Sequence, residues 1–481
     1  MNRNTIDTSF GFNSYSKIRS QHWNNQAKKL EDWRNAGHAY HSRLLEIYQN
    51  HIPPGSKILE LGSGTGDLLA GLNPSIGLGI DFSEEMLSFS KKHHPNVNFI
   101  QADVLSLDNI TGQFDYIILS DLINDVWDVQ KVFSELKRFC SPSTRVIINY
   151  YSRFWELALW LSAELGLSLK LLPQNWLTNE DVSNLLHLAG FEMVYKSQEV
   201  LFPIKIPLLS SFFNNFLVKC FPFNLLGLSN FIICRPTIEN NKVPLTTVII
   251  PARNEAGNIE NAVQRIPEMG AGTEIIFVEG NSTDNTYEKI QTAIELHPDK
   301  NCHLLKQPGK GKADAVRFGY EHSTGDVLMI LDADLTVIPE DLTRFYDALI
   351  TGKGEFINGV RLVYPMEKEA MRFLNFLGNK FFSITFSWLL GQPVKDTLCG
   401  TKVLWKQDYE RIKAGRSYFG DFDPFGDFDL LFGAARLKLK IVDMPVRYHE
   451  RTYGSTNISR WSHGWLLLKM VAFAATKIKF I

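Results

Sequence analysis

Two aspartates separated by one residue, Asp332 and Asp334, directly follow the apolar run 327–331. Side chains at positions i and i+2 of an extended chain lie on one face, so a turn there can aim both carboxylates at a single cation. Mg²⁺ and Mn²⁺ prefer such hard oxygen ligands, and either ion can bridge a diphosphate. We therefore predict Asp332 and Asp334 as metal ligands and Asp334 also as a catalytic residue.

Three glycines at alternating positions, Gly62, Gly64 and Gly66, follow the apolar run 57–61. Glycine lets the backbone approach a ligand closely, and the helix behind the glycines can aim its first amides at that ligand. The G-x-G-x-G spacing departs from the dinucleotide pattern G-x-G-x-x-G. Asp81 ends the next apolar run, where a carboxylate can accept both hydroxyls of a ribose. These residues predict a nucleoside-binding site in the first half of the chain.

Apolar runs of strand length alternate with amphipathic stretches on both sides of residue 240, which predicts an α/β fold with a parallel, doubly wound sheet in each half. The polar, proline-bounded segment between the halves is typical of a linker. We therefore expect residues 1–236 and 245–481 to form two domains joined by a linker at 237–244. The predicted strands are 57–61, 76–80, 98–101, 116–119 and 145–149, and then 247–251, 274–278, 327–331 and 441–444.

The composition is that of an average globular protein, with 44% hydrophobic and 21% charged residues among 481, which excludes disordered and multi-span membrane chains. Fifty Lys and Arg residues against 52 Asp and Glu residues leave no basic field, so nucleic acid is not an expected partner. The five cysteines have no C-x-x-C spacing, which favours reduced, structural thiols. With neither a signal peptide nor a spanning segment recognised, we expect a cytoplasmic protein that can associate peripherally with the membrane's inner face.

The first half resembles class I S-adenosylmethionine (SAM)-dependent methyltransferases over roughly residues 40–235. The resemblance rests on the stretch from Glu60 to Gly66 and on the register of the acidic residues that follow it. It implies a Rossmann-like fold and SAM as cofactor. It places Asp81 at the ribose, Asp103 at the adenine amine and Asp121 beside the methionine moiety. The implied SAM-binding residues are Glu60, Gly62, Gly64, Gly66, Asp81, Asp103 and Asp121.

No residue of the first half stands out as the base for methyl transfer. Asp125 and Asp128 are candidates, but we favour their interpretation as solvated carboxylates at the start of a helix. Between the expected antiparallel closing strands at 191–195 and 231–234 lies an apolar insertion, 204–228. It is either a cap packed over the substrate cleft or a flap that binds a lipid-linked acceptor or the bilayer interface.

The second half resembles family 2 glycosyltransferases of GT-A fold over roughly residues 245–470. The matching segments are 248–255, 277–286, 308–315 and the Asp332–Asp334 pair. In the second of these segments, Glu279 stands at the first of the family's two usual aspartates, and Gly280 replaces the other. The resemblance implies a nucleotide-sugar donor with Mg²⁺ or Mn²⁺. The implied donor contacts are Pro251, Arg253, Glu255, Glu279, Lys312, Asp332, Asp334, Arg361, Arg372 and Arg451.

The acceptor side resembles that of polyprenyl-phosphate sugar transferases such as dolichyl-phosphate mannose synthase. Arg361 and Arg372 match cationic positions that suit anionic phosphates, and 396–400 matches an acceptor-side D-x-x-C-G segment. Asp427 and Asp429 match a late acidic pair, of which one can deprotonate an acceptor hydroxyl while the other orients the acceptor. The acceptor is accordingly a polyprenyl phosphate or a growing surface glycan.

Two aromatic-rich stretches, 372–390 and 465–479, are too polar and too short to span a bilayer, and they either pack in the core or lie at a membrane interface. We therefore predict a bifunctional fusion of a methyltransferase and a metal-dependent, inverting glycosyltransferase. An active glycosyltransferase with a non-catalytic SAM-binding or acceptor-docking first domain is the alternative. A membrane-peripheral scaffold with both sites inactive is a third possibility.

Overall fold

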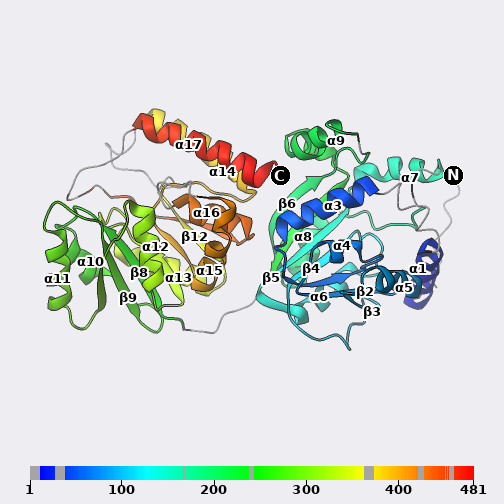
Figure 1. Cartoon of the computed structure of the whole chain (residues 1–481), viewed down its shortest axis with the longest axis horizontal. Coiled ribbons are helices and arrows are strands. Elements are labelled where there is room, and N and C mark those ends of the chain that lie inside the picture. Colours follow the sequence, from blue (N-terminus) through cyan, green and yellow to red (C-terminus); the bar gives the residue numbers. More distant parts are fainter. Residues whose placement is uncertain are drawn as a thin grey trace. The chain divides into compact units, whose positions relative to one another are not determined.

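The computed structural model describes residues 11–27, 38–165, 168, 170–204, 206–237, 243–361, 373–420, 427–449, 451, 453 and 460–481. The chain divides into two compact units, residues 1–237 together with 480–481, and residues 238–479. Each unit is built around one seven-stranded sheet (Figure 1). All five cysteines are free thiols, as predicted.

The sheet of the N-terminal unit has the strand order β3-β2-β1-β4-β5-β7-β6. Its first five strands are parallel, whereas β7 runs antiparallel to both β5 and β6. The strands that follow β1 are added first on one side of it, as β2 and β3, and then on the other side, as β4 and β5. Ligands of open α/β sheets bind at such a switch point, here between β1 and β4. The strands are β1 (Lys57–Leu61), β2 (Ile76–Asp81), β3 (Asn98–Gln101), β4 (Phe114–Ser120), β5 (Cys140–Tyr151), β6 (Phe191–Glu199) and β7 (Ser229–Pro236).

Both faces of this sheet are covered by apolar side chains, because its central strands alternate between two cores. Leu59 and Leu61 of β1 belong to one cluster of buried residues, and Ile58 belongs to the other. Neighbouring strands and the helices α3, α4, α5, α6 and α8 supply further members of these clusters (Figure 1). The helices of this unit are α1 (Phe12–Ala27), α3 (His38–His51), α4 (Asp67–Gly71), α5 (Glu84–His93), α6 (Val129–Leu136), α7 (Glu156–Glu164), α8 (Asn179–Leu188) and α9 (Leu209–Ser211).

Polar residues fix where several of these helices begin. The Oγ of Ser83 accepts the Met86 amide at the start of α5, and Asp128 accepts the Lys131 amide at the start of α6. Side-chain acceptors at this position satisfy amides that have no partner within the helix. Asp128 is therefore a helix cap, as its position in the sequence predicted.

The sheet of the C-terminal unit has the order β10-β9-β8-β11-β13-β12-β14, with a switch point between β8 and β11. β13 runs antiparallel to both of its neighbours, so this sheet is mixed, whereas a parallel sheet was predicted for this half. The antiparallel closing strands expected in the first half are present as β6 and β7. Successive side chains of β8 again belong alternately to two cores, with Ile249 in one cluster and Val248 and Ile250 in the other. The strands are β8 (Thr246–Ala252), β9 (Thr273–Glu279), β10 (Asn301–Lys306), β11 (Val327–Ile330), β12 (Phe356–Val360), β13 (Lys402–Trp405) and β14 (Ile441–Pro445).

The two aromatic-rich stretches form long helices that pack against each other, α14 and α17. Each helix buries one side in the C-terminal core, through Phe386 and Leu390 of α14 and Met470 of α17. No helix in the described ranges is both long and apolar enough to cross a membrane. The helices are α10 (Ile259–Arg265), α11 (Thr286–Leu296), α12 (Lys312–His322), α13 (Leu342–Ile350), α14 (Phe373–Leu390), α15 (Lys406–Ala414), α16 (Asp427–Arg436) and α17 (Arg460–Ala474).

Candidate functional site

The three glycines of the N-terminal unit form a tight loop between β1 and α4, and each has a positive φ, of 70°, 49° and 74° in order. A Cβ on Gly62 would lie 2.8 Å from the Leu122 side chain, and one on Gly66 would lie 2.5 Å from the ring of Phe99. Contact with these neighbouring side chains is thus sufficient to explain why positions 62 and 66 are glycine. A Cβ on Gly64 would meet nothing within 4 Å, so Gly64 borders open space at the switch point of the sheet.

Asp81 fastens this loop to the end of β2. One of its carboxylate oxygens accepts the Gly64 amide at 2.9 Å, and the other accepts the Ser83 amide at 2.9 Å. Burial raises the pKa of the Asp81 carboxyl, while the amides of Ser83 and Gly64 oppose that shift. Asp81 therefore holds the loop in shape, and its oxygens retain acceptor capacity for a ligand.

Glu60 lies directly before the loop and is 2% exposed. Its Oε2 has no hydrogen-bond partner in the described structure, and neither has the Oγ of Ser63. Burial raises the pKa of the Glu60 carboxyl well above its usual value, and the nearby Asp81 adds to the shift. A buried carboxylate oxygen without a donor is costly, so this position fits a ligand that brings a positively charged donor.

Asp121 follows β4 on the other side of the switch point, and its carboxylate is surrounded by donors. Tyr40 donates to its two oxygens at 3.0 and 3.1 Å, and the Asn149 amide donates at 2.7 Å. Tyr151 also bonds to it, and Tyr40 shares a 2.7 Å hydrogen bond with Ser229. Burial raises the pKa of the Asp121 carboxyl to about 7, although the bonds from Tyr40 and Tyr151 act in the opposite direction.

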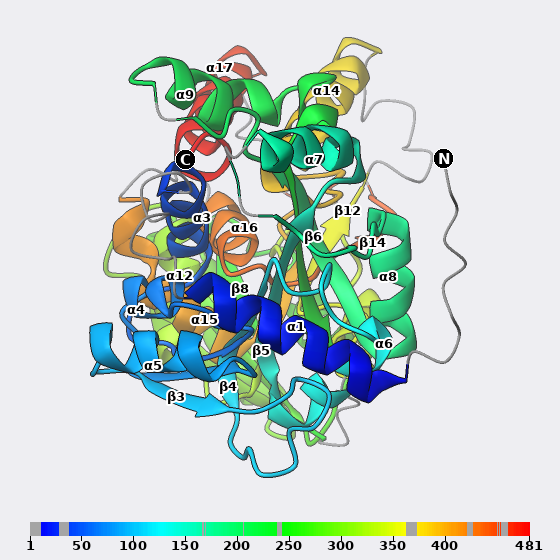
Figure 2. The ribbon, with the colours of Figure 1, turned by 90° about the vertical axis from the view of Figure 1, so that its right-hand side faces the viewer.

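Helix α1 lies across the same edge of the sheet (Figure 2). Its Ser16 donates to Asp103 at 3.1 Å, and its Asn24 accepts a hydrogen bond from Ser83 at 2.7 Å. The other oxygen of Asp103 accepts the amide of Leu105 at 2.9 Å. The helix therefore contacts the surroundings of the predicted ribose and adenine positions.

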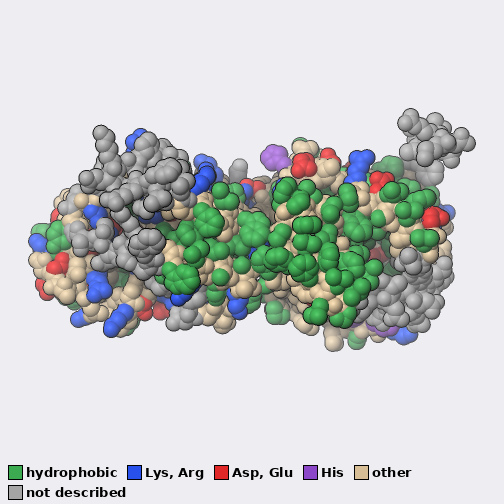
Figure 3. Space-filling view, turned by 90° about the horizontal axis from the view of Figure 1, so that it is seen from above, with side chains coloured by type: hydrophobic (Ala, Val, Ile, Leu, Met, Phe, Trp, Pro, Cys, Tyr) green, Lys and Arg blue, Asp and Glu red, His purple; other side chains and the backbone are tan. Residues whose placement is uncertain are grey.

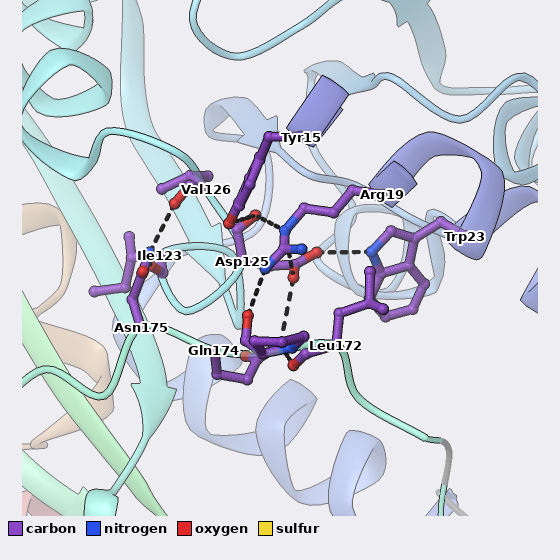
Figure 4. A network of polar contacts seen from close by, with 10 residues as sticks. Tyr15, Arg19, Trp23, Ile123, Asp125, Val126, Leu172, Gln174 and Asn175 are labelled. Carbon is purple, nitrogen blue, oxygen red and sulfur yellow. Dashed lines mark hydrogen bonds and ion pairs between the residues drawn. The ribbon is translucent and has the colours of Figure 1, made fainter. Parts of the chain in front are cut away.

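The strongest anchor of α1 is Asp125 (Figure 4). Arg19 forms an ion pair with its carboxylate at 3.0 Å, and Trp23 donates to the same carboxylate at 2.8 Å. Gln174, from a distant loop, donates at 3.3 Å. Burial raises the pKa of the Asp125 carboxyl, and Trp23 and Arg19 oppose the shift. The interpretation of Asp125 as a solvated helix-start carboxylate is wrong, because α1 covers it.

In the C-terminal unit, the loops after β8 and β9 are tied together at the switch point. The amide of Asn254 donates to Ser282 at 3.0 Å, and the Asn254 side chain accepts the Thr283 amide at 2.8 Å. Glu279, at the end of β9, is buried and accepts the Ser282 amide at 2.6 Å. Of the other residues predicted in this region, Pro251 is half-buried within β8 and Arg253 is exposed just beyond the strand.

Asp332 and Asp334 follow β11 across the switch point, and each carboxylate faces a cation. The Nζ of Lys312 lies 2.6 Å from Asp332, and the Nη2 of Arg451 lies 2.6 Å from Asp334. Burial alone would raise the pKa of the Asp332 carboxyl, but the Lys312 ammonium outweighs it and lowers the pKa. The same Arg451 reaches Glu255 at 3.6 Å, so the loop after β8 joins the cluster.

The segment 396–400 packs directly behind the aspartate pair. A Cβ on Gly400 would lie 2.1 Å from the Asp332 carboxylate and 2.4 Å from the Lys312 Nζ, so a side chain there would displace this ion pair. Asp396 holds Arg361 through two bonds of 2.8 and 3.0 Å. Burial opposes the charge of Asp396, yet Arg361 lowers the pKa of its carboxyl.

Of the late acidic pair, the structure describes the side chain of Asp429. It is buried between Arg416, at 2.8 Å, and Arg317, at 3.3 Å. Arg317 lies on α12, which begins at Lys312, so this helix carries a cation for the aspartate pair at its start and a cation for Asp429 about 7.5 Å further along its axis. Asp427 is the first residue of α16, and its side chain lies outside the described structure, as does the whole of Arg372.

Tyr40 and Arg19 were not evident from the sequence, because they come from N-terminal helices that carry no motif and only the fold brings them to the site. Thr336, two residues after Asp334, was also missed, and it donates to that carboxylate at 2.8 Å. Among the described residues, no group of three or more His, Cys, Asp or Glu side chains is arranged to hold a metal ion. The Asp332–Asp334 pair therefore offers two protein carboxylates to a cation, and its remaining ligands have to come from a bound molecule or water.

Comparison with known proteins assigns a family to each unit. The model of glycosyl transferase family 2 matches residues 247–410, and a methyltransferase domain model matches residues 52–191. A dolichyl-phosphate β-glucosyltransferase of Trichomonas vaginalis is 31% identical over 241 residues, which cover 45% of this chain and 67% of the relative. Glycosyltransferase AglJ of Haloferax volcanii is 28% identical over 222 residues, which cover 46% of this chain and 68% of the relative.

The N-terminal unit also resembles solved structures. A SAM-dependent methyltransferase from Thermotoga maritima aligns with a TM-score of 0.36 at 17% identity, over 45% of this chain and 98% of the other. The predicted fold class, a Rossmann-like methyltransferase fold followed by a GT-A fold, is confirmed by the two matched families and the two sheets. The chain thus belongs to glycosyl transferase family 2 through its C-terminal domain and carries a methyltransferase domain before it.

Proposed function

We propose that the chain is a bifunctional transferase. Its C-terminal domain transfers a sugar, with inversion, from a nucleotide-sugar to a polyprenyl phosphate, and its N-terminal domain transfers a methyl group from SAM. The observation that carries the glycosyl transfer is the Asp332–Asp334 pair at the switch point, with Lys312, Arg451 and Glu255 gathered around it. The two carboxylates can bind the metal ion, and the cations beside them can contact the phosphates of the donor.

The aspartate pair fits Mg²⁺ or Mn²⁺, since its oxygens are the hard ligands that these ions prefer. When bound, the ion would offset the negative charge that develops on the nucleoside diphosphate leaving group. Lys312 and Arg451 are placed to contact the phosphates once the carboxylates turn to the cation. Pro251 and Glu279, at the ends of β8 and β9, and Arg253, just beyond β8, would contact the nucleotide.

The acceptor decides which further residues act. A lipid phosphate is already anionic at neutral pH and needs cations, so Arg361 and Arg372 would bind it. A glycan hydroxyl, the alternative acceptor, needs a base. Asp429 forms ion pairs with two arginines, so its oxygens are already engaged, and we assign it to positioning and Asp427 to proton abstraction. The relatives named for dolichyl phosphate favour the lipid acceptor.

For the N-terminal domain, the glycine loop and its carboxylates fit SAM. The unpartnered Oε2 of Glu60 would accept a donor from the positively charged methionine end, and the open space over Gly64 would admit the ligand. Asp81 would hold the ribose and Asp103 the adenine amine, with Asp121 beside the methionine moiety. An N-terminal domain that binds SAM without transferring its methyl group is the alternative, because no acceptor base is assigned by the family resemblance.

We place the protein in the cytoplasm, in peripheral contact with the inner face of the membrane through α14 and α17. Phe381 and Ile384 on α14 and Trp465 on α17 are exposed although the other side of the same helices is buried. Lys469 lies over the ring of Trp465, and Lys479 lies over Trp388. Lysines beside tryptophans suit the boundary between lipid tails and headgroups.

The direct test of two separate sites is the variant Asp334→Asn. It should abolish sugar transfer, because the second carboxylate at the cation is lost, and it should leave SAM binding measured by calorimetry unchanged. Asp326→Ala is the matched control, since Asp326 is an exposed aspartate at the opposite end of β11. Full sugar transfer by the Asp334→Asn variant would refute the assignment, and loss of SAM binding with it would contradict two independent sites.

A further inference from the structure

The N-terminal domain exposes an unusual amount of apolar surface. About half of the large apolar side chains that are exposed in the described structure belong to two of its segments, 154–165 and 204–226. The first segment contains α7, which has no buried residue although most of its side chains are apolar. Leu157 is 66% exposed and Trp160 is 58% exposed. A helix of this composition needs a partner outside the domain core.

The second segment is the apolar insertion. Leu208, Phe212 and Phe221 stand out from it, with Leu208 88% exposed and Phe221 80% exposed. The indole of Trp155, at the start of α7, donates to the backbone oxygen of Leu226 at 2.8 Å, so the two segments lie side by side. Figure 3 shows the hydrophobic side chains gathered on this face of the domain. We call residues 154–165 and 204–226 the insertion face.

We propose that the insertion face docks on a lipid bilayer, so that the methyltransferase domain has its own membrane contact. This contact is separate from the one assigned above to α14 and α17. It also decides between the two interpretations of the insertion, in favour of a flap at the membrane interface.

The shape and composition of the insertion face favour a bilayer over a protein partner. Its most exposed side chains project from the surface, whereas the dominant contacts of protein interfaces fill pockets. The sequence of the face carries only four charged residues, Glu156, Glu164, Lys205 and Lys219, and Lys219 is paired with the buried Glu199, so the face is chiefly apolar. Phenylalanine, leucine and tryptophan are the residues with which peripheral proteins enter the headgroup boundary.

The insertion face is continuous with the acceptor end of the proposed methyltransferase site. Tyr151, the last residue of β5, pairs with Ser229, the first residue of β7, and both belong to the network around Asp121. The chain enters the insertion face at the residues that follow Tyr151 and leaves it just before Ser229, and the Ser152 amide donates to the Leu228 oxygen at 2.8 Å. The methyl acceptor is therefore a lipid-linked molecule presented from the bilayer. This second step rests on the proposed function, whereas the docking does not.

The test is flotation of the full-length protein with vesicles of mixed phosphatidylcholine and phosphatidylglycerol, without SAM, metal or nucleotide-sugar. The double variant Leu157→Glu with Phe212→Glu places a charge on each segment and should lower the vesicle partition coefficient by about tenfold or more. Leu188→Glu is the matched control, because Leu188 is 58% exposed on α8 of the same domain, away from the insertion face. It should change binding by less than about twofold.

A second double variant, Leu165→Glu with Leu208→Glu, provides the same test if the first does not fold. Circular dichroism and thermal melts verify that each variant is folded. Phe381→Glu with Trp465→Glu measures the contribution of α14 and α17 separately. Unchanged flotation of both insertion-face variants overturns the proposal. The proposal is also overturned if the wild-type protein is a dimer in analytical ultracentrifugation and these variants are monomers that still float with vesicles, because the face would then bind a second copy. Because no substrate is present, failure here leaves the proposed activities untouched.

Discussion

At the scale of single residues, the site is a set of carboxylates that depend on their neighbours for their charge. Asp332 is next to the Lys312 ammonium, whereas Asp121 has only hydroxyl and amide donors around it. A buried carboxylate without a cation binds its proton more tightly, and one beside a cation releases it. The two domains therefore respond differently to pH.

Asp121 should make the stability of the N-terminal domain fall as the pH rises. Its pKa is about 7 in the folded protein against 3.8 for an aspartate in an unfolded chain, so between these values the folded state keeps a proton that the unfolded state has lost. This stability is complete below the unfolded value and is lost as the pH passes 7. Asp121→Asn cannot titrate, so relative to wild type it should gain about 3 kcal/mol in unfolding free energy between about pH 5 and pH 8.

Denaturant unfolding at the two pH values measures this difference. Asp128→Asn is the control, because Asp128 is an exposed helix cap that asparagine replaces well. Parallel pH curves for wild type and Asp121→Asn would contradict the raised pKa.

At the scale of elements, the strands were predictable and much of what covers them was not. The run 57–61 was expected as a strand because it is apolar and β-branched, and it has the same bounds in β1. The covering helix α1 has no amphipathic pattern that reveals its role, since its key contacts to Asp103 and Asp125 are with residues about 90 to 110 positions away. Strands β10, β12 and β13 were not predicted, and the four residues of β13 are too few to carry a periodic signal.

The same limit applies to how much of the candidate site the sequence could predict. Motif residues such as Gly64 and Asp334 occupy loops that directly follow a strand, β1 and β11 respectively, where local spacing identifies them. Their partners, such as Arg451 and Tyr40, come from elements far away in the chain. Only the fold brings these partners to the carboxylates, so spacing could not reveal the pairings.

Two glycines of one loop should respond differently to alanine. Gly66→Ala would place a Cβ 2.5 Å from Phe99, and we expect a loss of about 2 kcal/mol in stability from this overlap and the positive φ. Gly64→Ala meets no atom of the protein, so the loss should be about 1 kcal/mol. Its methyl group enters the space assigned to SAM, however, and SAM affinity should fall by about tenfold or more. Calorimetry and thermal melts separate the two effects, and wild-type SAM affinity of Gly64→Ala would place the ligand elsewhere.

Helix α1 should loosen when its anchor is removed. Arg19→Ala deletes the ion pair to Asp125 and the hydrogen bond to the Pro173 oxygen, which together hold the middle of the helix. Amide hydrogen exchange in residues 12–27 should accelerate by about tenfold, as local opening becomes less costly. Lys17→Ala is the matched control, since Lys17 is an exposed cation on the same helix. Equal exchange in the two variants would show that Arg19 does not anchor α1.

At the scale of the whole molecule, two α/β domains each place their candidate residues at a switch point of a seven-stranded sheet. The glycine loop and Asp121 flank β1 and β4, and the loop at Glu255 and the aspartate pair flank β8 and β11. Each domain has two apolar cores of its own, so each site is supported within its domain.

The central claim is the transfer of a sugar to a polyprenyl phosphate, and one measurement tests it most directly. Purified full-length protein with Mg²⁺ or Mn²⁺ is given a panel of UDP- and GDP-sugars, with and without a short-chain polyprenyl phosphate. We expect turnover of one donor that requires both the metal and the lipid phosphate. Donor turnover that is the same without the lipid, or an absence of turnover with every donor, would contradict the claim.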